Sequence, residues 1–304
     1  MGIAVIGTTF VDVKGYPFGK YVPAGRNAGR VVEVHGGVAR NIAEDIANAG
    51  LASKLVSVVD ESGLSDDLVN RLAERGCDIS CIERADSGLG MWLAIFDETG
   101  DVVGSISRRP DESGIERILI DRGDEIVSQA ESVCVDLDID ERILDRVLDL
   151  AQRYCKEVYS PVTNIAIACE RRELLEKVAC LVCNQQESGE LFSTDFSDAS
   201  PDEMRAVLPG YLTQIGLRRM VVTMGAQGSV FAQSDGRSGW CPAEAVEVVD
   251  TTGAGDAFFA GVAIGLTNGK SLEESCAIGT KLAASAISSE ENVCGRFAPE
   301  DLGL

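Results

Sequence analysis

Histidine is almost absent from this chain of 304 residues, which contains only His35. Zinc sites draw on several cysteine or histidine ligands, and the Cys180–Cys183 pair has no evident second ligand pair elsewhere in the sequence. We therefore expect no zinc centre. We interpret the single histidine as a packing or hydrogen-bonding residue rather than a catalyst.

Long apolar runs are also missing. No uninterrupted stretch approaches the 18 residues or so that suggest a membrane-spanning helix, and the N-terminus lacks the charged region and cleavage site of a secretory signal. The ten cysteines are scattered, mostly in apolar surroundings that suit small buried side chains. These features predict a cytoplasmic protein with reduced thiols.

Basic residues are scarce, with 27 Lys and Arg against 49 Asp and Glu, for a net charge of −22. A surface this acidic argues against nucleic acids and anionic membranes as partners. An anionic substrate would need local help from backbone amides, a metal ion or a few basic side chains. The apolar share of 45% is ordinary for a globular protein.

The most informative segment covers residues 247–266. It begins with β-branched Val248 and Val249, breaks at the turn-like residues 251–255, and continues as an almost wholly apolar run. This pattern predicts the end of a strand, a glycine turn and a helix buried on most sides. Free amides in the first turn of such a helix favour an anion such as a phosphate. Asp256 in that turn is either an ordinary acidic residue favoured by the helix dipole or a base beside a phosphate.

This segment, DTTGAGDAFFAG, resembles the C-terminal signature of the ribokinase-like carbohydrate kinases, the PfkB family. The resemblance implies that Asp256 is the catalytic base. It also implies that the amides of Gly253, Ala254 and Gly255 form an anion hole for the transferred phosphoryl group. ATP and Mg²⁺ are the implied cofactors.

A second glycine turn, at Gly36 and Gly37, precedes apolar residues at helical spacing. It resembles the N-terminal signature of the same family, in which the glycines let a sugar lie against the backbone. The resemblance implies that Asn41 hydrogen-bonds the sugar and that Asp12, at the end of a strand predicted over residues 3–13, holds sugar hydroxyls. Taken without the resemblance, Asn41 fits a surface helix position, and Asp12 fits either a turn cap or a ligand contact.

Short apolar strands alternate with helical segments along the rest of the chain. This alternation predicts a parallel sheet covered by helices on both faces, with the active site outside the carboxyl ends of the strands. We expect a single ribokinase-like α/β kinase domain over residues 1–304. The strands predicted after residue 13 cover residues 54–59, 79–82, 132–137, 158–162, 178–183, 220–223 and 229–232.

A β-hairpin with its turn at residues 98–100 is predicted from alternating residues around a glycine. In the family a small sheet covers the sugar as a lid, and the resemblance implies a lid from about 14–35 and 87–110. Such lids often pair into homodimers in the family. Met91 and Trp92 are either core residues of this sheet or contacts to the substrate.

Two further motifs follow predicted strands. Asn184 and Glu187 match the family's Asn-x-x-Glu motif, whose side chains face the same way on a helical turn and order water around Mg²⁺. The second motif resembles the family's nucleotide-side strand and glycine turn, and it comprises Thr223, Gly225 and Gly228. The resemblance implies that these residues contact ATP phosphate or ribose. It implies that Asn184 binds ATP as well. Taken alone, these are ordinary turns.

The resemblance further implies a monovalent-cation site, suited to K⁺, at the backbone near Asp250 and Thr252. For the acceptor, Arg40 and Asn41 within the glycine motif are most similar to the pseudouridine kinase branch. We therefore expect conversion of pseudouridine to pseudouridine 5′-phosphate. Ser160 stands where that branch commonly has an aspartate. The alternatives are a kinase for ribose, fructose, adenosine or a similar acceptor, and a non-catalytic sugar-binding regulator.

Overall fold

The computed structural model describes residues 2–304, which form a nine-stranded and a four-stranded sheet. In the large sheet the strands follow the order β13-β12-β11-β10-β9-β8-β1-β4-β5, with parallel pairing from β11 to β5 and antiparallel pairing at β12 and β13. These strands are β1 (Ile3–Ile6), β4 (Ser53–Val59), β5 (Asp78–Arg84), β8 (Ser132–Val135), β9 (Glu157–Pro161), β10 (Cys180–Asn184), β11 (Arg219–Thr223), β12 (Ser229–Gln233) and β13 (Ser238–Cys241).

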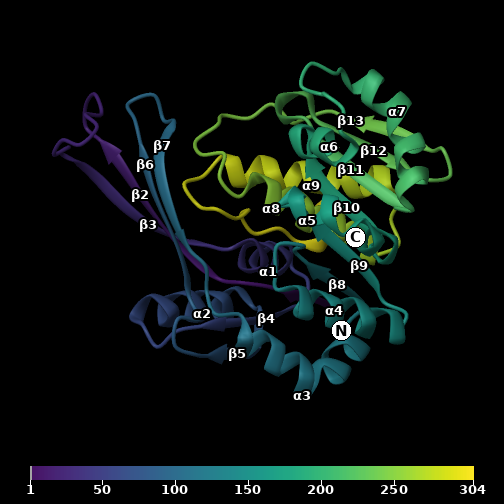
Figure 1. The fold of residues 1–304 in the computed structure, drawn as a ribbon, viewed down its shortest axis with the longest axis horizontal. Helices are drawn as coiled ribbons and strands as arrows, with labels where there is room; N and C mark the ends of the chain where they lie inside the picture. The colour runs from purple at the N-terminus through teal and green to yellow at the C-terminus, as the bar shows by residue number, and fades with distance from the viewer. Residues whose placement is uncertain (1) are drawn as a thin grey trace.

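Helices cover both faces of the large sheet (Figure 1). No helix in the described part of the chain is both long and apolar enough to cross a membrane. The α-helices are α1 (Val38–Asn48), α2 (Gly63–Arg75), α3 (Ser113–Gln129), α4 (Glu141–Arg153), α5 (Ile165–Glu170), α6 (Gln185–Phe192), α7 (Pro201–Ile215), α8 (Ala254–Thr267) and α9 (Leu272–Ile287). The 3-10 helices are η1 (Arg172–Lys177), η2 (Gly225–Gln227) and η3 (Pro299–Leu302).

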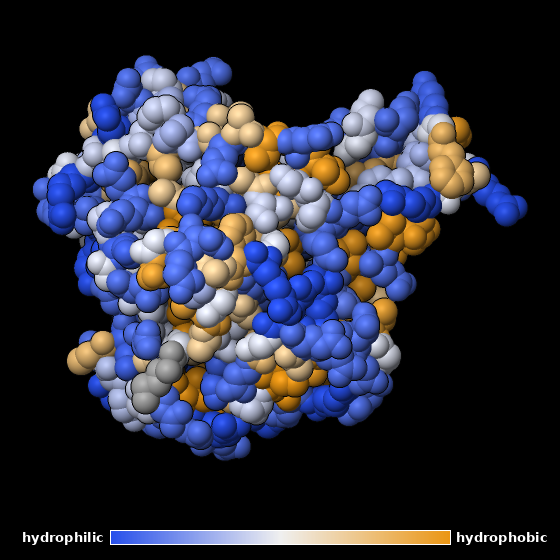
Figure 2. All heavy atoms as spheres, turned by 180° about the vertical axis from the view of Figure 1, so that it is seen from behind, coloured by the Kyte–Doolittle hydropathy of each residue, from blue (hydrophilic) through white to orange (hydrophobic). Residues whose placement is uncertain are grey.

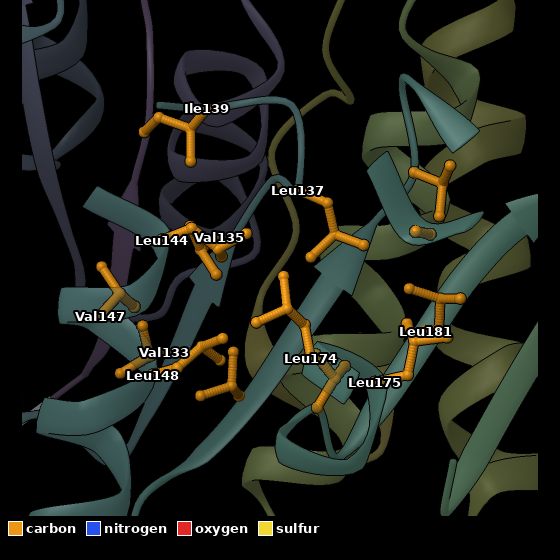
Figure 3. Close-up of a cluster of buried hydrophobic side chains, with 14 of the residues drawn as sticks. Val133, Val135, Leu137, Ile139, Leu144, Val147, Leu148, Leu174, Leu175 and Leu181 are labelled. Carbon is orange, nitrogen blue, oxygen red and sulfur yellow. The ribbon is translucent and has the colours of Figure 1, made fainter. Parts of the chain in front are cut away.

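Successive side chains of the central strands point to opposite faces of the large sheet, so the core forms two layers. In β1, Ala4 and Ile6 face the cluster with α3, α4 and α7, whereas Ile3 and Val5 face the cluster with α1, α2, α8 and α9. Successive side chains of a strand point to opposite faces, so a strand at the centre of a covered sheet must be apolar throughout. Figure 3 shows the first layer, where Val133 and Val135 of β8 lie near Leu144 and Leu148 of α4.

The small sheet has the order β3-β2-β6-β7 and projects from the body (Figure 1). We call it the lid. It consists of β2 (Phe10–Pro17), β3 (Gly29–Gly36), β6 (Gly90–Phe96) and β7 (Val102–Arg108). The predicted β-hairpin is confirmed as β6 and β7.

The single strand predicted over residues 3–13 is wrong, because β1 ends at Ile6 and β2 begins at Phe10 in the other sheet. The chain leaves the large sheet at Thr9, whose hydroxyl donates to the carbonyl oxygen of Val58 at 2.6 Å. Asp12 therefore lies inside a lid strand instead of at the end of a core strand. Apolar alternation alone did not reveal this change of sheet.

The strand predicted just before the glycine turn is also wrong. Val248 and Val249 are more than half exposed and lie in an irregular segment, where the amides of Val249 and Asp250 donate to the carbonyl oxygen of Ile287 at 2.8 and 3.4 Å. The helix predicted after the turn is confirmed as α8, and its residues from Ala257 to Gly265 are buried. Burial on nearly all sides explains why its sequence lacks a polar face.

Candidate active site

The turn before α8 depends on a glycine. Gly253 is the N-cap of α8 and has φ 80°, a left-handed conformation that side chains disfavour. A Cβ at this position would lie 2.0 Å from the carbonyl oxygen of Asn292. In contrast, a Cβ at Gly255 would meet nothing within 4 Å. The first glycine is thus required by the fold, whereas the second faces open space at the helix N-terminus.

Backbone amides of this turn point away from internal partners. Ala254 N–H donates to the carbonyl of Thr251 at 3.3 Å, and the first regular α8 bond runs from Ala257 to Gly253. Within residues 2–304 the amides of Gly253, Gly255 and Asp256 have no such backbone acceptor. These amides, more than that of Ala254, are therefore available to an anion.

Asp256 lies in the first turn of α8, where its carboxylate meets Asn41 of α1. Asn41 Nδ2 donates to Asp256 Oδ2 at 2.7 Å, although the two residues are 215 positions apart. Burial raises the pKa of Asp256 to about 7; the Asn41 hydrogen bond lowers it, and the charges of Asp136 and Asp12 raise it. A carboxyl group with a pKa close to neutral is suited to accept a proton during turnover.

A buried ion-pair network fixes the orientation of the Asn41 amide. Arg40, which is 1% exposed, donates through Nη1 to Asn41 Oδ1 at 2.6 Å and through Nη2 to Glu44 Oε2 at 2.6 Å. Arg71 on α2 donates through Nε to the other oxygen of Glu44 at 2.9 Å. Because the amide oxygen is held by a guanidinium, the amide nitrogen must face Asp256.

Asp12 lies on the lid strand β2, against the second glycine turn. A Cβ at Gly36 would lie 2.6 Å from both carboxylate oxygens of Asp12, so this close approach needs a glycine. Asn292 Nδ2 donates to Asp12 Oδ2 at 3.3 Å. Burial raises the pKa of Asp12 to about 6, against the lowering charges of Lys14 and Arg40.

Gly37 has φ 96° and directly precedes α1. A Cβ there would lie 2.8 Å from both Phe10 N and Thr8 O, at the point where the chain enters the lid. Both glycines predicted from the motif are thus sterically required. They set α1, which carries Asn41, directly against the base of β2.

Lys14 is a site residue that the sequence analysis missed. Its ammonium donates to Asp250 Oδ2 at 3.3 Å and to Thr252 Oγ1 at 3.1 Å, and the residue is 2% exposed. The side chains of Asp250 and Thr252, whose backbone the resemblance puts near a monovalent cation, are therefore already bound to an ammonium, which does not fit a second cation on the same side-chain oxygens. The available signal was the alternation of β2, which puts Lys14 and Asp12 on one face.

Asp136 was also missed. It follows β8 directly and accepts from the Thr163 hydroxyl at 2.6 Å. Burial raises the pKa of Asp136 to about 6, and its charge contributes to the raised pKa of Asp256. The strand predicted over residues 132–137 includes Asp136, whereas β8 ends at Val135, so the sequence did not show that Asp136 follows a strand.

The residues predicted for ATP lie at the carboxyl ends of two neighbouring strands. Asn184 of β10 pairs with Thr223 of β11, and Gly225 and Gly228 follow with φ 56° and 90°. Asn184 is also the N-cap of α6: its Oδ1 accepts from Glu187 N at 2.8 Å, and Glu187 Oε2 accepts from Asn184 N at 2.7 Å. No hydrogen bond in the described residues joins this group to Asp256.

The second carboxylate oxygen of Glu187, Oε1, is not used in the α6 cap and could bind a metal ion directly or through water. In residues 2–304 no group of three or more His, Cys, Asp or Glu side chains is arranged to hold a metal ion. A single carboxylate such as Glu187 is of the kind that Mg²⁺ uses, since this ion keeps several waters and is usually bound by few carboxylates together with substrate phosphates.

Comparisons with known proteins identify the family of this chain. Residues 2–293 match the profile of the pfkB family carbohydrate kinases. A guanosine-inosine kinase of Exiguobacterium acetylicum is 32% identical over 292 residues, which cover 95% of each chain. A pseudouridine kinase of Escherichia coli is 28% identical over 290 residues, 95% of this chain and 91% of the relative.

Solved structures establish the fold. The ribokinase of Arabidopsis thaliana, complexed with ribose and ATP, superposes with a TM-score of 0.84 at 19% identity, covering 99% of this chain and 98% of that one. The ribokinase of Giardia lamblia superposes with a TM-score of 0.85 at 15% identity, covering 99% of this chain and 98% of that one. The predicted ribokinase-like α/β fold is therefore confirmed. The chain belongs to the pfkB family of carbohydrate kinases and is a phosphotransferase with a hydroxyl group as acceptor.

Proposed function

We propose that this enzyme transfers the γ-phosphoryl group of ATP to a ribose hydroxyl of a nucleoside. The observation that carries the proposal is the Asn41–Asp256 hydrogen bond of 2.7 Å beside the free amides of the α8 turn. This juxtaposition supports a site in which Asp256 acts as the base and the free amides form an anion cradle that binds the phosphoryl group. The relatives named as nucleoside kinases cover almost the whole chain, which supports a nucleoside over a free sugar.

In the proposed reaction the acceptor hydroxyl oxygen attacks the γ-phosphorus as the bond to the β–γ bridging oxygen breaks. Asp256 accepts the hydroxyl proton, and ADP leaves with the bridging oxygen. The amides of Gly253, Gly255 and Asp256 stabilise charge on the moving phosphoryl group. Asp12 and Asn41 position the acceptor. Asn184, Thr223, Gly225 and Gly228 bind the nucleotide.

Mg²⁺, when bound near Glu187, supplies charge neutralisation for the ATP phosphates. A monovalent cation at the backbone near Asp250 and Thr252 stays a prediction, and the side chains of both residues are bound by the Lys14 ammonium.

We propose guanosine or inosine as the first acceptors to test, because the Exiguobacterium relative carries the highest identity given above. Pseudouridine, the acceptor expected from Arg40 and Asn41, is the second candidate and is supported by the Escherichia coli relative. Both classes present a ribose to Asp12 and a base to the lid. Trp92 supports a base contact: it is partly exposed and pairs in register with Asp12, so both side chains leave the lid on the same face.

The test is release of ADP from Mg-ATP with guanosine, inosine, pseudouridine, adenosine, ribose and fructose, using Asp256→Asn as the blank. Phosphorus NMR of the product identifies the esterified hydroxyl. Turnover on a nucleoside with formation of a 5′-phosphate is the expected result. Turnover on ribose or fructose alone would contradict the nucleoside assignment, and ligand binding without any ADP release would indicate a regulator.

We also propose a homodimer through the outer face of the lid. The face opposite Asp12 carries Val31, Leu93, Ile95 and Ile106, of which Val31 is 70% and Ile106 71% exposed. Figure 2 shows apolar side chains gathered on the projecting lid. Light scattering of the wild type should give twice the chain mass. Ile106→Glu should give the monomer mass, and a monomeric wild type would contradict the proposal.

A further inference from the structure

Lys14 is a buried ammonium that crosses from the lid to the catalytic turn. Lys14 is 2% exposed, and its Nζ lies 3.3 Å from Asp250 Oδ2 and 3.1 Å from Thr252 Oγ1. An ammonium that leaves water at such cost must be paired and hydrogen-bonded. Here both partners belong to the segment that leads directly into α8.

Asp250 ties this ammonium to the anion cradle. Its second oxygen, Oδ1, accepts from Thr252 N at 2.8 Å and from Thr252 Oγ1 at 2.7 Å. Thr252 immediately precedes Gly253, the N-cap whose amide is one of those available to an anion. The positive charge of Lys14 is therefore held at the start of the turn that would receive the phosphoryl group.

A separate monovalent ion on these side-chain oxygens would lie close to the ammonium. Two unit positive charges about 4 Å apart repel by roughly 4 kcal/mol at an effective dielectric constant near 20. The Asp250 carboxylate can neutralise one of them. A second cation must therefore displace Lys14 or bind elsewhere.

The site also has a clear need for positive charge. The charges of Asp12 and Asp136 both act on Asp256 at the catalytic turn, and ATP brings further negative charge. Arg40, the other buried cation of the site, is committed to Glu44 and Asn41. Lys14 is the basic residue that directly contacts the segment preceding α8.

We propose that the Lys14 ammonium serves as a built-in monovalent cation for phosphoryl transfer, so that the enzyme needs no K⁺. The proposal rests on the proposed kinase function. Lys14 is a positioning residue in this view: it neutralises Asp250 and keeps the turn in the conformation that exposes its amides. Turnover should then depend on the charge at position 14 and not on the salt supplied.

The experiment measures ADP release by the wild type and by Lys14→Met in KCl, NH₄Cl and choline chloride at equal ionic strength. The wild type should turn over equally in all three salts. In choline chloride Lys14→Met should lose about tenfold or more, the scale of losing one contact to a charged group. K⁺ or NH₄⁺ should restore much of that loss by occupying the vacated oxygens.

Three results would overturn the proposal. The first is a wild type that loses activity when K⁺ is withdrawn, and the second is a Lys14→Met variant that is as active as the wild type in choline chloride. The third result is a Lys14→Met variant that is equally impaired in all three salts. The last would mean that Lys14 acts in a way that a cation cannot replace. If Lys14→Met does not fold, Lys14→Gln takes its place and the wild-type salt series remains decisive.

Thermal melting gives a readout independent of turnover. The Tm of the wild type should be the same in KCl and choline chloride, because an ion that binds the native state raises Tm and none is expected to bind at this turn. A K⁺-specific rise would overturn the proposal. Failure of the kinase assignment is distinguishable, since it would abolish ADP release in every salt while leaving the melting comparison intact.

Discussion

Asn41 Nδ2 lies 2.7 Å from Asp256 Oδ2, so the two glycine motifs of the sequence meet in one hydrogen bond. The amide of Asn41 cannot rotate freely, because Arg40 Nη1 holds its oxygen at 2.6 Å. The second carboxylate oxygen of Asp256 remains for the acceptor hydroxyl. This arrangement makes the protonation of Asp256 the property to measure first.

The pH dependence of turnover should reflect Asp256. Because only the carboxylate accepts a proton and the pKa of Asp256 in the free enzyme is about 7, kcat/KM should rise with pH through neutrality and level off above it. Asp256→Asn should reduce kcat by roughly 10²–10⁴. A pH-rate profile of kcat/KM and the kcat of the variant check these statements, and near-normal turnover of the variant would rule out the base role.

Asn41→Ala should move the rising limb of that profile to higher pH. The Asn41 hydrogen bond lowers the pKa of Asp256, and a hydrogen bond to a charged group contributes about 1.5–3 kcal/mol, which corresponds to roughly one to two pH units. The measurement is the midpoint of the limb in kcat/KM, because weaker acceptor binding lowers the whole profile without moving its midpoint. An unchanged midpoint would mean that the 2.7 Å contact does not lower the pKa of Asp256 in the free enzyme.

Gly253→Ala and Gly255→Ala should fail in different ways. A Cβ at Gly253 meets the Asn292 carbonyl oxygen at 2.0 Å and requires φ 80°, so this variant should lose stability by several kcal/mol, about 1–3 of them from backbone strain. A Cβ at Gly255 enters open space at the anion cradle. That variant should melt like the wild type but turn over slowly. Equal melting temperatures for both variants would contradict the steric argument.

Asp12→Asn should stabilise the protein at neutral pH while weakening acceptor binding. Burial raises the pKa of Asp12 from 3.8 to about 6, so the folded state holds a proton that the unfolded state releases, and the free energy of unfolding falls as pH rises across that window. The variant lacks the titrating carboxyl group, so its free energy of unfolding should not fall in this way. The gain over the wild type is at most about 3 kcal/mol above pH 6.

Urea unfolding at pH 4 and pH 7.5 tests the Asp12 prediction. The variant should exceed the wild type at pH 7.5 and match it at pH 4. Exposed Asp86→Asn is the control, with no expected change. A variant that is less stable at pH 7.5 would show that the buried carboxylate is stabilised by its neighbours Lys14 and Asn292 more than burial destabilises it.

Glu187→Gln should raise the Mg²⁺ concentration needed for half-maximal turnover by about tenfold, the scale of losing a partner of the metal shell. Glutamine keeps an oxygen that can accept from Asn184 N, so the α6 cap is preserved. Glu190→Gln is the matched control, since Glu190 is exposed on the same helix. An equal Mg²⁺ requirement for both variants would remove Glu187 from the metal site.

Short-range patterns in the sequence determined the two helices that follow the glycine turns, most of the strands and the two glycine turns themselves. The buried helix after DTTGAGD is almost wholly apolar, and Gly37 and Gly253 have positive φ values, 96° and 80°, that side chains disfavour. These are properties of a few neighbouring residues, so they can be read locally. The motif residues around Asn41 and Asp256 point to phosphoryl transfer through their resemblance to the two family signatures, which the amino-acid sequence also carries.

Only the tertiary structure decided which charges share the site. Lys14 lies 236 residues from Asp250, and the crossing of β2 into the lid brings the two together. The pKa of Asp256 likewise depends on burial and on Asp136 and Asp12, which arrive from other strands. Electrostatic interactions act through space over several ångströms, and no periodicity of a single segment encodes them.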